Sequence, residues 1–171
     1  MAQIKIDVNV LKELSNFEAA TYFAVLSTMN EEGKSCSTIN DIAKILSVSN
    51  VIGKNLKKFK EKGYIQITKG CRADGKAGIQ NYYNYNIPDR YYITVDSKIL
   101  ELPITPMQLG TLLKLKAHTL IYTNIIPFDI TTISRDLKIN KKAVKMLIEL
   151  NIIQTDPLGF KLEDESIFLI N

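Results

Sequence analysis

The sequence predicts a mainly α-helical fold with small β hairpins, of the α+β class, in which one arrangement of elements occurs twice. Three observations predict it: apolar residues recur at helical spacing, short alternating segments follow the helices, and the second half of the chain resembles the first. Hydrophobic residues make up 46% of the 171 residues and charged residues 23%, which is typical of a folded chain. We therefore expect two compact domains, residues 1–88 and 89–171.

The repeat begins with two similar segments, one near the start of each half. Residues 4–11 match residues 93–100 in their isoleucine, leucine and aspartate positions. Further along, Gly63 and Asn151 stand at matching places, where a helix ends in a residue that tolerates positive φ and a strand begins. The spacing between matching positions changes little, as short loop insertions in a duplicated domain would cause. Pro88 ends a strand pattern, so the boundary is expected there.

A helix follows each of these first segments. Ser15 precedes Glu18 by three residues, and Thr105 precedes Gln108 in the same way. In this spacing the hydroxyl accepts a hydrogen bond from the third helical amide while the longer side chain reaches back, which is a capping box. The sequence therefore predicts helices at about 16–29 and 106–119.

The next segment of the first half predicts two short helices separated by a sharp turn. Residues 41–46 form the first helix, and Ser49 is expected to cap the second, whose core side is Ile52, Leu56 and Phe59. The remaining positions are expected on other faces, where amide, methyl and ammonium groups can contact bases and phosphates. They are Asn50, Val51, Lys54, Asn55, Lys57 and Lys58, and Ser49 is also expected to contact DNA.

A hairpin with a basic, glycine-rich tip completes the first half. Residues 64–69 and 82–87 alternate as strands do, and the segment between them contains three glycines. Lys69, Arg72 and Lys76 can enter a minor groove or hold phosphate there. The positive charge is local: residues 44–76 contain nine basic and two acidic residues, whereas the whole chain carries a net charge of +4. A concentrated patch of this kind attracts a polyanion.

The first half resembles the winged helix-turn-helix proteins of bacteria, phages and plasmids, including MarR-like regulators and replication initiators. The residues that carry the resemblance are 42–49, 56–65 and the hairpin that ends in Asn81 and Tyr82; Ser47 replaces the usual turn glycine. The resemblance implies tandem winged helix-turn-helix domains that bind duplex DNA, with one helix in the major groove and a basic wing beside it. It also implies a role in transcription regulation or in plasmid or phage replication initiation, and a possible homodimer.

The second half contains its own set of lysines. Lys141, Lys142 and Lys145 follow Asn140, which is expected to cap a helix. The acidic run 163–165 follows, and it repels phosphate. This half is expected to bind either DNA or another protein, such as a replication or transcription protein.

An enzyme is one alternative, because a strand-nicking nucleophile could come from the tyrosine cluster of residues 82–92. The supporting groups are missing from the sequence: His118 is the single histidine, and Cys36 and Cys71 have no metal-ligand spacing. We expect no catalysis, no cofactor and no metal.

The other alternative is a protein-interaction adaptor in a partition or replisome complex. The basic glycine-rich tip favours DNA over this reading, because an assembly surface is expected to expose apolar residues. No segment has the length of apolar residues that a membrane span needs, and the first residues do not resemble a secretory leader. We expect a cytoplasmic protein.

Overall fold

A computed structural model describes residues 3–49, 51–72, 74–76 and 78–170. Two compact units share these residues. The first, called here the α5 unit, is formed by the chain up to Ala20 and from Pro88 onward, and the second, called the α4 unit, is Thr21–Ile87. No helix among the described residues has the length and apolar character needed to cross a membrane.

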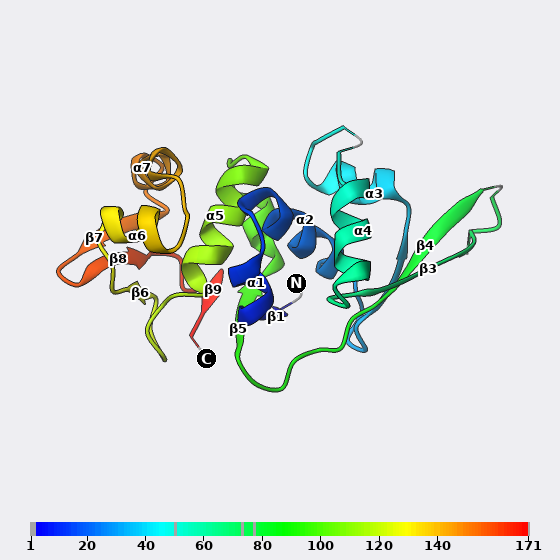
Figure 1. The fold of residues 1–171 in the computed structure, drawn as a ribbon, viewed down its shortest axis with the longest axis horizontal. Coiled ribbons are helices and arrows are strands. Elements are labelled where there is room, and N and C mark those ends of the chain that lie inside the picture. Colours follow the sequence, from blue (N-terminus) through cyan, green and yellow to red (C-terminus); the bar gives the residue numbers. More distant parts are fainter. Residues whose placement is uncertain (1–2, 50, 73, 77, 171) are drawn as a thin grey trace. The chain divides into compact units, whose positions relative to one another are not determined.

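The α4 unit contains helices and one three-stranded antiparallel sheet with the strand order β2-β4-β3. The β3–β4 hairpin of this sheet projects beyond α4 (Figure 1). The hairpin pairs Gln66 with Asn84 at one end and Cys71 with Ile79 at the other. The core of this unit includes the aromatic pair Tyr22 and Phe59, whose ring centroids are 5.3 Å apart. Its elements are the second part of α2 (Asn16–Leu26), β2 (Lys34–Ser37), α3 (Ile39–Ile45), α4 (Gly53–Glu61), β3 (Gln66–Cys71) and β4 (Ile79–Asn84).

The α5 unit contains two three-stranded antiparallel sheets, with the orders β1-β5-β9 and β6-β8-β7. The helix α5 is buried along almost its whole length. The elements of this unit are β1 (Gln3–Asp7), α1 (Val8–Glu13), the start of α2, β5 (Tyr92–Asp96), the 3₁₀ helix η1 (Ser97–Glu101), α5 (Pro106–Lys116), β6 (Ile125–Ile126), α6 (Ile130–Asp136), α7 (Lys141–Glu149), β7 (Ile153–Asp156), β8 (Gly159–Leu162) and β9 (Phe168–Leu169).

Several local predictions are confirmed. The capping boxes form: Ser15 N donates to Glu18 Oε2 over 2.9 Å, and Thr105 N donates to Gln108 Oε1 over 2.7 Å. Gly63 and Asn151 both have positive φ, at 73° and 55°. These features depend on neighbours within three or four residues, which is why the sequence predicts them well.

The predicted fold class is wrong. The described residues are 39% helical and 23% strand, with seven α-helices and three small antiparallel sheets, so the fold is mixed α+β, and no tandem winged-helix architecture is shown. The two matching segments that were expected to open separate domains pair with each other instead, Ile4 opposite Val95 and Ile6 opposite Ile93. An isolated strand leaves its backbone N–H and C=O groups without hydrogen bonds, and pairing with each other supplies those bonds to both strands. The described residues up to Ala20 therefore group with those from Pro88 onward.

Candidate nucleic-acid interface

One side of α4 is a row of lysines, called here the α4 lysine face and defined by Lys54, Lys57, Lys58 and Lys60. Leu56 and Phe59 on the other side are buried, together with Ile52 just before the helix. Lys54, Lys57 and Lys60 are exposed and Lys58 is half-buried. With 3.6 residues per turn, burial of one side places these ammonium groups toward solvent. The Lys57 Nζ lies 3.7 Å from Glu61 Oε1. Both side chains are exposed, so this ion pair neutralises the lysine charge only weakly.

Asn55 does not belong to this face, although the sequence placed it among the DNA-contacting candidates. It is buried, and its Nδ2 donates to Thr21 Oγ1 over 2.9 Å. Its amide therefore serves the core of the α4 unit. The spacing in the sequence does indicate that Asn55 is buried. It stands three residues after Ile52 and four before Phe59, and both of these lie on the core side of the helix.

The start of α4 also differs from the expectation. The helix begins at Gly53 and its N-cap is Ile52; no side chain among the described residues caps it, so Ser49 is not the cap. Ser49 and Val51 are exposed in the turn that precedes the helix. Asn50, the residue expected to read adenine, lies outside the described residues. Ser47 has a φ of 53°, so it adopts the left-handed conformation that a glycine would take in this turn.

The β3–β4 hairpin supplies the second group of cations, Lys69, Arg72 and Lys76. Lys69 and Lys76 are exposed, whereas Arg72 is partly covered. The Tyr82 hydroxyl donates to the Cys71 carbonyl over 2.7 Å. The ring of Tyr82 lies against Gly70, where an added Cβ would be only 2.7 Å from Tyr82 Cε2. Gly70 thus makes room for the tyrosine that fastens this end of the hairpin.

Arg72 is held by an acidic neighbour. Its Nε and Nη2 donate to the two carboxylate oxygens of Asp74 over 2.9 and 2.6 Å, and Asp74 Oδ1 also accepts from Lys76 N over 3.2 Å. Hydrogen bonds from Arg72 lower the pKa of Asp74 to about 2, so this carboxylate is charged at any physiological pH. The hairpin tip therefore carries less positive charge than its two basic residues suggest.

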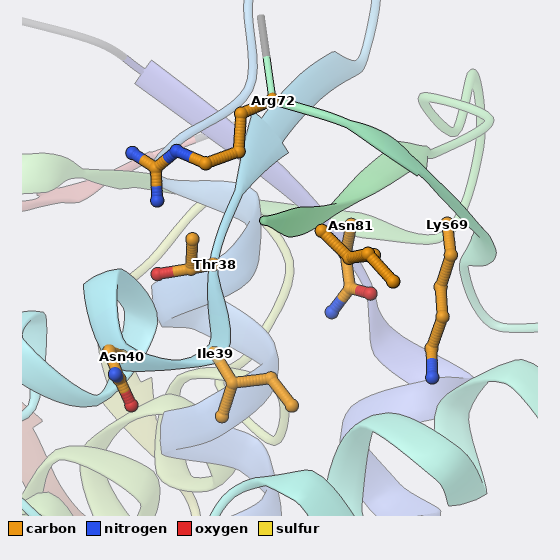
Figure 2. Close-up of a pocket in the computed structure, with 7 residues that line it drawn as sticks. Thr38, Ile39, Asn40, Lys69, Arg72 and Asn81 are labelled. Atoms are coloured by element: carbon orange, nitrogen blue, oxygen red, sulfur yellow. The ribbon is translucent and has the colours of Figure 1, made fainter. Parts of the chain in front are cut away.

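Arg72 and Lys69 line a groove of about 440 Å³ between the hairpin and the start of α3 (Figure 2). Thr38, which precedes α3, closes a capping box with Asp41, and its hydrogen bonds lower the pKa of that carboxyl group. Of the described residues that line the groove, none is acidic, and Asn40 and Asn81 add amide groups. The sequence did not single out the residues of α3 and β4 here, because they approach Lys69 and Arg72 only through the folding of the sheet. The lining residues are Thr38, Ile39, Asn40, Lys69, Arg72, Ile79 and Asn81.

The second set of predicted lysines lies on α7, in the α5 unit. Lys141, Lys142 and Lys145 are all exposed. Asn140 caps this helix as expected, with its Oδ1 accepting from Lys142 N over 2.8 Å. Val144 and Leu147 face the core, so α7 repeats the amphipathic design of α4.

No family model, curated protein or solved structure matches this chain. The chemistry of the interface is consequently inferred from its own residues. The described part of the chain contains no group of three or more His, Cys, Asp or Glu residues placed to hold a metal ion. Tyr83, from the tyrosine cluster, is buried, and that burial raises its pKa, which disfavours the phenolate that a nucleophile needs.

Proposed function

We propose that this protein binds duplex DNA through the α4 lysine face and the β3–β4 hairpin, with α4 in the major groove. The observation that carries the proposal is the separation of faces on α4, where one side packs in the core and the other presents four lysines with one acidic residue among them. Lysine ammonium groups neutralise backbone phosphates and release their counterions, which is the main source of affinity for DNA.

The groove beside the hairpin extends the cationic surface. Lys69 and Arg72 line it together with the amides of Asn40 and Asn81. Phosphate oxygens accept hydrogen bonds from both kinds of group, so this groove suits a backbone segment that flanks the major groove.

Binding to duplex DNA, measured by fluorescence anisotropy at several salt concentrations, tests the proposal. If the surface neutralises about 5 to 8 phosphates, log affinity falls against log salt with a slope of about −5 to −7. Lys54→Ala is expected to weaken binding to every duplex and to reduce the slope by about 1. Lys34→Ala is the matched control, because Lys34 is exposed in the same unit but lies on β2 and pairs with Glu32 at 2.8 Å. A flat salt response, or equal effects of the two substitutions, would contradict the proposal.

The biological role that we propose is transcription regulation or initiation of plasmid or phage replication. The sites bound in the genome separate the two. An inverted repeat that overlaps a promoter supports a regulator, working as a homodimer on a two-fold site. An array of direct repeats supports an initiator.

A protein-interaction adaptor is the second candidate function, and one surface of the α5 unit favours it. Tyr91, Ile121 and Tyr122 are 79%, 81% and 75% exposed and line one depression of about 280 Å³. Both tyrosines have positive φ, 52° and 57°, a strained conformation for large side chains. Exposed apolar groups that gather in this way mark binding surfaces for proteins. Ile121→Asp would then abolish association with the partner protein while leaving DNA affinity unchanged.

A further inference from the structure

A basic pocket of the α5 unit is separate from the proposed DNA-binding surface. It lies where the end of α1, the end of α5 and the turn after α6 converge, and its volume is about 690 Å³. Small-molecule sites range from about 300 to 1,000 Å³, so this pocket has room for a ligand with several functional groups.

Positive groups line the pocket from three elements. Lys12 comes from α1, Lys114 from α5 and Lys138 from the turn after α6, and His118 follows α5. Two acidic residues, Glu13 and Asp136, also line it. The charge of Asp136 is already satisfied, since Arg135 donates to its two carboxylate oxygens over 2.6 and 3.0 Å.

Lys114 is the decisive residue. The residue is only 5% exposed, and it lines the pocket together with Lys12 and Lys138. Burial lowers its pKa; Glu18 raises this pKa, and Lys138 lowers it further. Covering this ammonium costs free energy, and Glu18 offsets that cost only in part, because desolvation has the largest influence on its pKa. An anion in the pocket would offset more of the cost.

His118 reports the same positive environment. Burial, Lys12 and Lys114 together lower its pKa to about 4, so its imidazole is neutral at pH 7. A neutral imidazole can donate one hydrogen bond to a ligand while adding no further charge.

We propose that this pocket binds a small phosphate-bearing molecule, with Lys114 at its base and Lys12 and Lys138 at its rim. Phosphate suits the site because three ammonium groups match a multiply charged anion, and lysine binds phosphate as a point charge. The Lys114 ammonium stabilises the bound anion, and binding of a phosphorylated metabolite can thereby alter the stability of the α5 unit.

The test is a titration of the full-length protein with inorganic pyrophosphate, followed by NMR of the His118 ring. Because the chain has a single histidine, its ring signals need no further assignment. We expect a saturable shift of the His118 signals and a rise of its pKa from about 4, because the anion offsets the charges of Lys12 and Lys114.

Lys114→Met removes the buried charge while keeping an unbranched side chain, and it is expected to weaken pyrophosphate binding by about tenfold or more. Lys138→Gln, at an exposed position, is a second variant that weakens binding if Lys114→Met does not fold. Lys145→Met, on the exposed side of α7, is the matched control and should bind as the wild type does.

Absence of a saturable shift, or equal affinity of wild type, Lys114→Met and Lys138→Gln, would overturn the proposal. Displacement of pyrophosphate by duplex DNA would also overturn it, because the pocket would then be a contact for the DNA backbone. The titration itself contains no DNA, so its failure and the failure of the proposed DNA binding are distinguishable.

Discussion

Arg72 and Asp74 form a two-point ion pair at the tip of the β3–β4 hairpin, with Nε–Oδ1 and Nη2–Oδ2 distances of 2.9 and 2.6 Å. The pair orients the guanidinium beside the groove that Lys69 also lines, but it offsets the positive charge there. In the proposed complex, DNA phosphate and the Asp74 carboxylate compete for the same guanidinium.

Asp74→Asn is therefore expected to strengthen DNA binding several-fold at low salt and to steepen the salt slope by up to about 1, because one repelling charge is lost. Anisotropy titrations at several salt concentrations measure both. Glu32→Gln is the matched control, since Glu32 is also an exposed acid paired with a basic residue two positions away, at 2.8 Å from Lys34. Equal changes in the two variants would show that only the total charge matters.

The effect of Asp74 is expected to be independent of pH over the physiological range. Its pKa is about 2, so it stays charged from pH 7.5 down to pH 5. The ratio of affinities between Asp74→Asn and wild type should remain constant over this interval. A ratio that falls toward 1 at pH 5 would mean that the carboxylate is not held by Arg72.

Asn55→Ala is expected to lower the free energy of unfolding by about 1 to 3 kcal/mol, because it leaves the buried Thr21 hydroxyl without its donor. DNA affinity should not change, since Asn55 is in the core. Urea unfolding and anisotropy measure the two quantities. The neighbouring Lys54→Ala gives the opposite pattern, with stability within about 0.5 kcal/mol of wild type and weaker DNA binding.

Gly110→Ala is expected to destabilise the α5 unit by about 2 to 4 kcal/mol. A Cβ at Gly110 would lie 1.6 Å from the backbone oxygen of Asn16, where α5 crosses the start of α2. Beside it, Asn16 Nδ2 donates to Thr111 Oγ1 over 2.7 Å, so this crossing cannot widen without losing a buried hydrogen bond.

Gly53→Ala is the matched control for this substitution. Its Cβ would be 3.9 Å from Ile39 Cδ1, an ordinary contact, and Gly53 is also helical. We expect stability to be unchanged or raised by up to about 1 kcal/mol. Thermal unfolding compares the two variants, and a similar loss in both would refute the close approach at Gly110.

Lys116 is expected to make stability depend on alkaline pH. It is buried, its Nζ donates to Asn124 Oδ1 over 2.6 Å, and burial lowers its pKa from 10.5 to about 8. Between about pH 8 and 10.5 the unfolded chain holds this proton and the folded protein does not, so stability rises with pH in that window.

Lys116→Met should remove that rise. We compare the unfolding free energy of the variant minus that of the wild type. This difference is expected to stay constant from pH 6.5 to 7.5, where Lys116 is charged in both states. It should then fall as the pH approaches 10.5, because only the wild type gains stability there. Urea unfolding at each pH measures it. A difference that does not vary with pH would show that Lys116 is not buried as a cation.

The sequence alone determined those parts of the protein that depend on near neighbours. The capping boxes at Ser15 and Thr105, the positive φ at Gly63 and the amphipathic pattern of α4 each arise from residues a few positions apart, and the structure has all of them. The exposure of the α4 lysines follows from the same periodicity.

Tertiary structure decided what depends on which distant surfaces meet. It paired β1 with β5, buried Asn55 against Thr21 and enclosed Lys114 and Lys116 among the apolar residues of α5. It also brought Asn40 and Asn81 to the groove of Lys69 and Arg72. Local spacing predicts the face on which a residue lies, but long-range packing selects the partner of that face, because burial gains free energy only after separate segments come together.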